Sequence, residues 1–230
     1  MKKKLVALTG AGISAESGLA TFRGADGLWE GHRIEEVATP EGWAANPELV
    51  LEFYNQRRAA ARAAQPNAGH LALAALEQEF DVVVVTQNVD DLHERAGSSR
   101  VLHLHGKLFE SRSSYFDQLV YPMSSDRIEL GDLCEQGHQL RPNIVWFGEA
   151  VPMMEQAMEE AAKADVFLVI GTSLQVYPAA GLVSYVPSNC PIYIIDPQQP
   201  PVSARRNLHF VLEPASTGVP RVAAELIRNA

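Results

Sequence analysis

The stretch KLVALTGAGISAESGLATFR, residues 4–23, decides the fold of this chain. Its apolar run Leu5–Leu8 leads into Thr9-Gly10-Ala11-Gly12, and a helix-like segment starts at Ile13. This order predicts a buried strand, a glycine turn and a helix start. Glycines in such a turn let a pyrophosphate approach backbone N–H groups at the positive end of the helix. We therefore predict a phosphate-binding turn, although an ordinary strand-to-helix turn would look similar.

The same stretch departs from the usual dinucleotide-binding fingerprint in two ways. A third glycine would fall at Ala15, and the fingerprint also expects a second strand that ends in Asp or Glu roughly 20 residues further on. Residues 21–29 instead read TFRGADGLW, with two glycines, no β-type run and an arginine, Arg23, in place to reach a phosphate. A conventional NAD dehydrogenase is therefore the weakest interpretation.

Composition places the chain among ordinary globular proteins. Its 230 residues, 47% of them hydrophobic, suffice for one large domain or for a large and a small lobe. The formal charge of −9 argues against a nucleic-acid-binding surface. Two cysteines, Cys134 and Cys190, are too few for a disulfide framework, so we expect a reducing, cytoplasmic environment. The apolar run Leu5–Leu8 is too short for a signal peptide, and no stretch approaches the ~20 residues of a membrane span.

The clearest strand is Asp81–Val85, a continuous β-branched run typical of strands buried on both faces of a parallel sheet. Similar runs occupy residues 166–170 and 191–195. The first run ends in TQNVD, residues 86–90, and ligands of open α/β sheets bind at the carboxyl ends of strands. Polar residues there are therefore site candidates. Asn88 and Asp90 could alternatively serve only as caps of the following helix.

Residues 30–70 contain no strand signal and are predicted to be helical. Thr39-Pro40-Glu41 and Asn46-Pro47-Glu48 each combine a capping side chain, a proline at the first helical position and an early acid. Two helices are therefore expected, and the second should run from about residue 47 to about residue 64.

This second helix carries a pair of polar side chains that can act together. Tyr54 and Arg57 are spaced i, i+3, so they project from the same face and can converge on one small group. Such a pair is usually part of a solvated amphipathic face, which is the expectation for Arg58 and Arg62. A guanidinium and a phenol can, however, bind a carboxylate by charge-assisted hydrogen bonds.

Taken together, the motifs of this chain resemble those of the sirtuins, which are NAD-dependent protein deacylases. The matching segments are residues 10–29 (GAGISAESGLATFRGADGLW), 66–70 (PNAGH), 86–90 (TQNVD), 105–109 (HGKLF), 141–149 (RPNIVWFGE) and 171–180 (GTSLQVYPAA). The resemblance implies a single catalytic domain, 1–230, built on an α/β, doubly wound, parallel Rossmann-like sheet. The implied large lobe is about 1–30, 70–108 and 142–230, and the implied small lobe comprises two insertions at about 31–69 and 109–141.

The resemblance also implies roles for individual residues, with NAD as co-substrate and acylated lysines of proteins or peptides as the second substrate. The implied NAD contacts are Gly10, Ala11, Gly12, Ser14, Ala15, Glu16, Phe22, Arg23, Gln87, Asn88, Val89, Asp90, Gly171, Thr172, Ser173 and Asp196. The implied substrate contacts are Ala38, Tyr54, Arg57, Val145, Phe147, Gly148, Glu149 and Val176. The substrate backbone would pair as an added strand along residues 147–149.

The catalytic residues implied by the resemblance are His105, Asn88 and Asp90. In the implied mechanism the acyl-lysine carbonyl oxygen attacks C1′ of the nicotinamide ribose and expels nicotinamide, after which His105 deprotonates a ribose hydroxyl. His103 is interpreted as structural. Sirtuins normally carry Asn where Asp196 stands, although a carboxylate can accept a hydrogen bond from a ribose hydroxyl.

The pair Tyr54 and Arg57, with the small Ala38 nearby, resembles the class III sirtuins, which remove succinyl, malonyl and glutaryl groups. An apolar pocket would reject the distal carboxylate of such groups, whereas a guanidinium and a phenol can bind it. We therefore expect succinyl-lysine to be preferred and acetyl-lysine to be accepted. Two alternatives remain open, a plain deacetylase and a catalytically silent NAD-sensing module.

The segment 110–141 lacks the two CxxC pairs with which sirtuins usually bind a structural zinc. The first pair would fall at Ser113 and Phe116, and near the second only Cys134 remains. We therefore expect no zinc, and a metal-free hairpin formed by residues 119–121 and 127–130. A remnant site of Cys134, His138 and Asp117 or Asp132 is the alternative. We also expect a monomer with no nucleic-acid or membrane partner.

Overall fold

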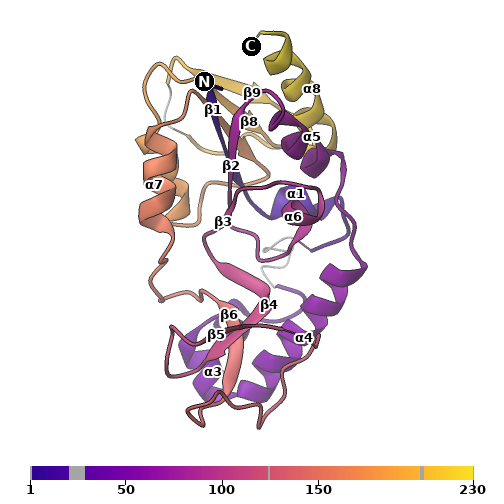
Figure 1. The fold of residues 1–230 in the computed structure, drawn as a ribbon, viewed down its shortest axis with the longest axis vertical. Coiled ribbons are helices and arrows are strands. Elements are labelled where there is room, and N and C mark those ends of the chain that lie inside the picture. Colours follow the sequence, from indigo (N-terminus) through magenta and orange to yellow (C-terminus); the bar gives the residue numbers. More distant parts are fainter. Residues whose placement is uncertain (1, 21–28, 124, 203–204, 230) are drawn as a thin grey trace.

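The computed structural model describes residues 2–20, 29–123, 125–202 and 205–229, and a six-stranded parallel sheet forms the core of its larger part, the upper part in Figure 1. The strand order is β3-β2-β1-β7-β8-β9. The strands are β1 (Lys4–Thr9), β2 (Asp81–Thr86), β3 (Val101–His103), β7 (Val166–Ile170), β8 (Ile192–Ile195) and β9 (Leu208–Val211). The three predicted runs are β2, β7 and β8, and the doubly wound α/β class is confirmed.

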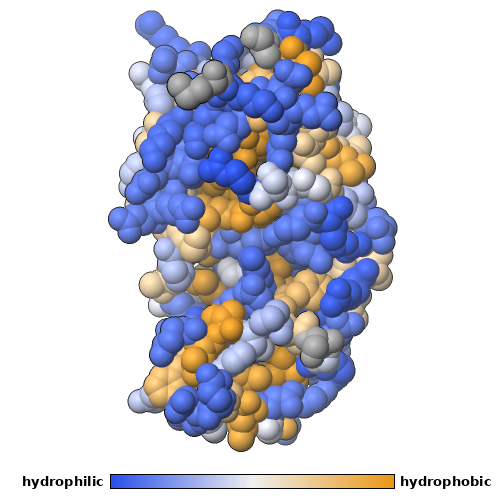
Figure 2. All heavy atoms as spheres, viewed as in Figure 1, coloured by the Kyte–Doolittle hydropathy of each residue, from blue (hydrophilic) through white to orange (hydrophobic). Residues whose placement is uncertain are grey.

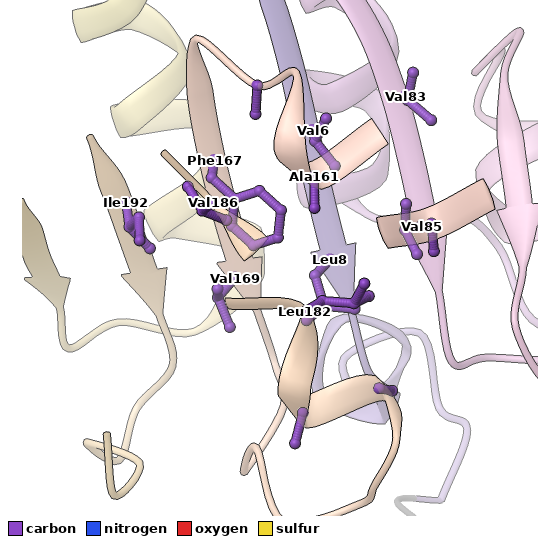
Figure 3. Packing of buried hydrophobic residues seen from close by; sticks show 14 of the residues in the cluster. Val6, Leu8, Val83, Val85, Ala161, Phe167, Val169, Leu182, Val186 and Ile192 are labelled. Atoms are coloured by element: carbon purple, nitrogen blue, oxygen red, sulfur yellow. The ribbon is translucent and has the colours of Figure 1, made fainter. Parts of the chain in front are cut away.

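Helices cover both faces of this sheet. They are α5 (Ala68–Leu76) and α8 (Ala215–Arg228) on one face, and α7 (Met154–Ala162) and the 3₁₀ helix η1 (Ala179–Tyr185) on the other. Alternate strand residues point to opposite faces, so Leu5 packs toward α5 and α8 while Val6 packs toward α7 and η1. Figure 3 shows the buried hydrophobic residues on the face covered by α7 and η1, where Phe167 lies beside Val186 and Ile192. This burial on both faces explains the continuous apolar runs.

Two short helices follow β1 and β2 at the carboxyl edge of the sheet. They are α1 (Ala11–Ala15) and α6 (Leu92–Arg95). Because β1 and β2 are parallel and pair in register from Lys4 with Asp81 to Thr9 with Thr86, both helices start at the same edge. Among the described residues, no helix combines the length and the apolar character needed to cross a bilayer.

A second, antiparallel sheet and a group of helices form the other end of the molecule (Figure 1). The sheet has the order β5-β4-β6, with β4 (Gly106–Ser113), β5 (Val120–Pro122) and β6 (Leu140–Ile144). The helices are α2 (Ile34–Val37), α3 (Pro40–Ala45) and α4 (Pro47–Ala63). Figure 2 shows a mainly hydrophilic face, with patches of hydrophobic residues over this end and also over the middle of the molecule.

The predicted caps of α3 and α4 form as expected. Thr39 Oγ1 accepts a hydrogen bond from the Gly42 amide at 2.9 Å, and Asn46 Oδ1 accepts one from the Leu49 amide at 3.1 Å. A proline occupies the first turn of each helix. These caps satisfy N–H groups that have no partner within the helix, so each helix begins where the sequence predicts.

The predicted hairpin between residues 119–121 and 127–130 is wrong. Strand β5 pairs with β4 instead, with Ser111 opposite Tyr121. The segment that was expected to be its partner forms no strand, because the Asn55 side chain of α4 both donates to Ile128 O at 3.1 Å and accepts from Ile128 N at 3.0 Å. The amide of Asn55 thus takes the place of a neighbouring strand, and Ile128 is buried.

The expectation that Arg58 lies on a solvated face is also wrong, whereas Arg62 is exposed as predicted. Arg58 is fully buried, and its Nε donates to Leu108 O of β4 at 2.8 Å. Its Nη1 donates to Asn55 Oδ1 and to Asp126 O. A buried guanidinium needs such acceptors, and two of them, Leu108 O and Asp126 O, come from segments packed on α4.

The region where sirtuins usually bind zinc is held together by other contacts. Ser113 is fully buried, and its hydroxyl accepts hydrogen bonds from the amides of Tyr115 and Phe116, each at 3.2 Å, and from Cys134 Sγ at 3.5 Å. The rings of Tyr115 and His138 stack with centroids 4.7 Å apart. The residues present do not fit a tetrahedral zinc site, and no described group of His, Cys, Asp and Glu could hold a metal.

Chelation should therefore leave the fold intact. We expect the purified protein to contain clearly less than one zinc per chain and to keep its melting temperature in excess EDTA, because hydroxyl and ring contacts hold this region. Elemental analysis and thermal melting with and without EDTA test the prediction. One tightly held zinc per chain, or a large fall in melting temperature on chelation, would contradict it.

Candidate active site

One cavity of about 920 Å³ combines residues from the large parallel sheet and from the small antiparallel end. Every predicted site residue that the structure describes lines it: Gly10, Ala11, Gly12, Ser14, Ala15, Glu16, Ala38, Tyr54, Arg57, Gln87, Asn88, Val89, Asp90, His105, Val145, Phe147, Gly148, Glu149, Gly171, Thr172, Ser173, Val176 and Asp196. Phe22 and Arg23 lie outside the described residues. Segments far apart in the sequence therefore meet in one place, as the motifs predict.

The glycines after β1 and β7 let two strand ends touch. The Gly12 amide donates to Gly171 O at 2.8 Å, and a Cβ on Gly12 would lie 2.6 Å from Gly171 Cα. Gly171 itself has a φ of +58°, which disfavours any residue with a side chain. The two glycines therefore allow the turns after β1 and β7 to pack closely, in addition to any role in letting a phosphate approach.

Asn88 and Asp90 join β2 to the glycine turn through Ser14. Asn88 Nδ2 donates to Gly10 O and to Ser14 Oγ, each at 3.1 Å, and Ser14 Oγ donates to Asp90 Oδ2 at 3.1 Å. Asp90 Oδ1 also accepts from the Leu92 amide at 3.1 Å, so the capping interpretation holds in part. Burial raises the pKa of Asp90. The two side chains are fixed rigidly against the floor of the cavity.

A buried network behind the cavity supports Asn88, and the sequence analysis did not identify it. Thr9 Oγ1 donates to Thr86 Oγ1 at 2.8 Å, and Thr86 Oγ1 also accepts from the Asn88 amide at 3.0 Å. His93 Nε2 lies 3.0 Å from Thr9 Oγ1. Because the Thr9 hydroxyl donates to Thr86, it accepts from His93, so the proton of this ring is on Nε2. Burial holds the pKa of His93 well below its ordinary value, which favours the neutral ring.

His105 lies in the turn between β3, which ends at His103, and β4, which begins at Gly106. Its Nδ1 is 3.0 Å from Gln87 O. A carbonyl oxygen can only accept, so Nδ1 carries the proton and Nε2 is left as a base. Burial lowers the pKa of His105, which favours this neutral form. His103 instead contacts Asn88 O and Glu94 at 3.1 and 2.7 Å, consistent with a structural role.

Tyr54 and Arg57 do converge at the α4 side of the cavity. Tyr54 is fully buried, and only 13% of the Arg57 side chain is exposed. Arg57 Cζ lies 4.4 Å from the centroid of the Trp29 ring, and Arg57 Nη1 is 3.5 Å from Glu30 Oε1. Its Nε is buried and has no hydrogen-bond acceptor among the described residues. The small Ala38 lines the same cavity.

The segment after β6 forms another wall. The Val145 amide donates to His105 O at 2.9 Å, and the Phe147 amide donates to Ala38 O at 3.0 Å. Glu149 turns inward, where Arg141 Nη1 donates to its Oε1 at 2.7 Å. The Glu149 carboxylate therefore shapes this segment from within the protein, while Gly148 is exposed.

Residues at the carboxyl end of β8 line the part of the cavity that lies on the parallel sheet. Asp196 Oδ1 accepts from the Gln198 amide at 2.9 Å, and burial raises the pKa of Asp196. Gln87 Nε2 donates to Thr172 Oγ1 at 3.1 Å and so joins the carboxyl ends of β2 and β7. Polar groups from three parallel strands thus surround this part of the cavity.

Several lining residues were not assigned from the sequence. Trp29, Leu108, Trp146 and Tyr177 all face the cavity. Each lies inside a matched motif, so position in the motif was the available signal. An apolar side chain in a motif can equally belong to the core, and only the fold shows that these four border a cavity.

A parallel sheet of this order, with a glycine turn after β1 and polar residues at the carboxyl ends of β2, β7 and β8, is typical of doubly wound α/β proteins, whose ligands bind at that edge of the sheet. A comparison with protein families matches residues 10–178 to the Sir2 family. The chain belongs to the Sir2 family.

Similar proteins support this membership over nearly the whole chain. A Helicobacter pylori protein named NAD-dependent protein deacylase is 52% identical over 228 residues, which are 99% of each chain. A Bacteroides thetaiotaomicron protein of the same name is 51% identical over 230 residues, covering 98% of each chain.

Solved structures of the same family have the same fold. A structure described as a Sir2 homolog–NAD complex matches with a TM-score of 0.88 and 41% identity over 99% of this chain and 91% of that one. A Sir2–p53 peptide–NAD⁺ structure matches with a TM-score of 0.77 and 29% identity over 99% and 93%.

Proposed function

We propose that this chain is an NAD-dependent protein-lysine deacylase that removes succinyl, malonyl and glutaryl groups from lysine side chains in preference to acetyl groups. The observation that carries the acyl preference is the buried Arg57 Nε, which has no acceptor among the described residues and lies beside a phenol in the cavity. A buried donor without a partner costs roughly 1–3 kcal/mol, and a carboxylate would satisfy it. The named activity of the similar proteins supports the deacylase part.

The glycine turn fits a dinucleotide. A Cβ on Gly10 would lie 2.7 Å from Gly171 O, so this position admits glycine alone, and the turn leads directly into α1. The positive end of a helix favours phosphate. We infer that Gly10, Ala11, Gly12 and Ser14 hold the pyrophosphate side of NAD, and that Gln87 and Asp196 contact ribose hydroxyls.

NAD, when bound, supplies the nicotinamide leaving group and the ribose that accepts the acyl group. Asn88 and Asp90 are rigidly placed by Ser14 to hold the nicotinamide end. The neutral His105 Nε2 removes a proton from a ribose hydroxyl, as a general base within the cavity must. The acylated lysine of a protein enters along residues 145–148, and one chain supplies all these groups, so a monomer suffices.

The acidic acyl group would extend toward α4. The small Ala38 would allow a chain longer than acetyl, and Tyr54 and Arg57, which line the same cavity, would bind its distal carboxylate. Transfer of an unpaired carboxylate into a buried site is costly, but a guanidinium and a phenol offset that cost. An acetyl group gains nothing from either donor, and this difference creates the preference.

A comparison of acyl peptides tests the proposal. Wild-type protein, NAD and matched succinyl- or acetyl-lysine peptides are mixed, and deacylated peptide and free nicotinamide are measured. We expect both peptides to react and kcat/KM to be higher for succinyl-lysine. No free nicotinamide with either peptide would favour a silent NAD-binding module, and equal or better use of acetyl-lysine would favour a plain deacetylase.

Activity should persist to mildly acidic pH. The base form of His105 is populated above its pKa, and burial lowers that pKa from its ordinary value of 6.5. The acid limb of kcat/KM should therefore lie below pH 6.5, with full activity at neutral pH. A pH profile on an acetyl peptide, whose acyl group does not titrate, measures it. A limb centred above pH 7 would contradict the assignment.

A further inference from the structure

We propose that Trp146 is a positioning residue that fixes Tyr54 as a hydrogen-bond donor toward the distal carboxylate of an acidic acyl group. The inference rests on the proposed acyl preference and adds a residue outside the Tyr54–Arg57 pair. Trp146 lies in the segment after β6, whereas Tyr54 lies on α4, and both line the cavity. Trp146 would thus act on selectivity through Tyr54 without touching the carboxylate.

The direction of the hydrogen bond between the two side chains is fixed by chemistry. Trp146 Nε1 lies 3.1 Å from Tyr54 Oη. An indole N–H can only donate, so the phenol oxygen accepts this bond and its own hydrogen must point elsewhere. Among the residues that the structure describes, none is seen to accept that hydrogen. A ligand carboxylate in the cavity is an acceptor of the required kind.

Trp146 is itself held from several sides. Its side chain is buried, and Arg141 Cζ lies 3.2 Å from the ring centroid. The Trp146 amide donates to Glu149 Oε2 at 2.7 Å, and Glu149 also pairs with Arg141. Trp43 packs against the ring with centroids 5.8 Å apart. The indole therefore cannot turn away from Tyr54 without losing its contact with the Arg141 guanidinium and its packing against Trp43.

Tyr54 is equally constrained and stays protonated. Its ring makes edge contacts with Trp29 and Phe53, with centroids 6.3 and 5.2 Å apart. Burial raises the pKa of Tyr54 to about 12, so the phenol keeps its hydrogen throughout the neutral range. With the ring fixed and one lone pair used by Trp146, the hydroxyl presents its hydrogen in a restricted set of directions.

This arrangement discriminates between acyl groups. A distal carboxylate accepts the hydrogen of Tyr54, whereas the methyl of an acetyl group has no acceptor. Loss of the indole N–H would free the hydroxyl to rotate and leave its oxygen without a donor. The ratio of kcat/KM for succinyl- over acetyl-lysine should therefore fall, mainly through KM for the succinyl peptide.

The test is a double-mutant cycle on that ratio. We expect Trp146→Phe to lower it roughly 3- to 10-fold, the effect of one neutral hydrogen bond, and Tyr54→Phe to lower it at least as much. In the Tyr54→Phe background, Trp146→Phe should lower the ratio no further, because the acceptor is already gone. Trp43→Phe is the matched control, since its ring packs on Trp146, and it should keep the ratio within about twofold of wild type.

The outcomes separate this inference from the proposed function. If the wild-type protein removes no acidic acyl group, both the proposed acyl preference and this inference are wrong. A wild type that prefers succinyl-lysine, with the ratio lost in Tyr54→Phe and kept in Trp146→Phe, overturns the role of Trp146 alone. If thermal melting shows that Trp146→Phe is unfolded, benzothienylalanine at position 146 removes the N–H at nearly constant shape, and a kept ratio there is equally decisive.

Discussion

His105→Ala should slow deacylation by orders of magnitude while the protein still binds NAD. His105 is held by Gln87 O through Nδ1, which leaves Nε2 as the only unprotonated nitrogen of the ring. Removal of a general base costs typically 10²–10⁴-fold in rate, and we expect a loss in this range for kcat. Peptide deacylation, followed by mass spectrometry, measures the loss. Calorimetric NAD titration should give an affinity close to that of wild type, because Nε2 acts in chemistry.

The order of steps allows a sharper test of the same variant. Nicotinamide leaves before His105 acts in the proposed mechanism, so exchange of labelled nicotinamide into NAD in the presence of acyl peptide should survive in His105→Ala. His209→Ala, on the edge strand β9, is the matched control and should deacylate normally. Near-normal deacylation by a folded His105→Ala protein would remove His105 from its role.

The sequence predicted the parallel sheet well because its information is local. The run Asp81–Val85 needs no knowledge of its neighbours to be recognised as a doubly buried strand, and the same holds for Val166–Ile170. Polar residues directly after such strands must meet at one edge of the sheet. The side of the cavity formed by β2 and β7 could therefore be located before the fold was known.

The small antiparallel end was harder to predict because its contacts are long-range. Periodicity places Arg58 on a face of α4 but says nothing of what packs there, and Leu108 and Asp126 cover it. A three-residue strand such as Val120–Pro122 does not specify its partner. Ile128 satisfies its backbone through a side chain, an arrangement that no strand pattern reveals.

The same reason explains which site residues were missed. Trp146 and Tyr54 are 92 positions apart, and Thr9 and His93 are 84 apart. Neither pair follows from spacing, since each forms only when β1, β2, α4 and the segment after β6 are assembled. Motifs name the residues at the cavity surface, whereas the hydrogen bonds that orient them are visible only in three dimensions.

Arg57→Met should selectively destroy removal of acidic acyl groups. Methionine keeps an unbranched apolar side chain against Trp29 and removes the guanidinium, including the buried Nε that has no acceptor among the described residues. The loss of one charge-assisted hydrogen bond costs about 1.5–3 kcal/mol, so kcat/KM for succinyl-lysine should fall roughly 10-fold to more than 100-fold. Steady-state kinetics on matched succinyl and acetyl peptides measure it, and acetyl removal should change far less.

Two variants show whether charge and geometry are both needed. Arg62→Met removes a guanidinium from the same helix at an exposed position, where its ion pair with Asp126 is solvated, and should leave the succinyl-to-acetyl ratio unchanged. Arg57→Lys keeps the positive charge and loses the planar fork that binds a carboxylate through two N–H groups, so it should restore only part of the ratio. Equal losses of both activities in Arg57→Met would mean that Arg57 supports the fold or NAD binding, and the acidic-acyl preference would then have no basis in this side chain.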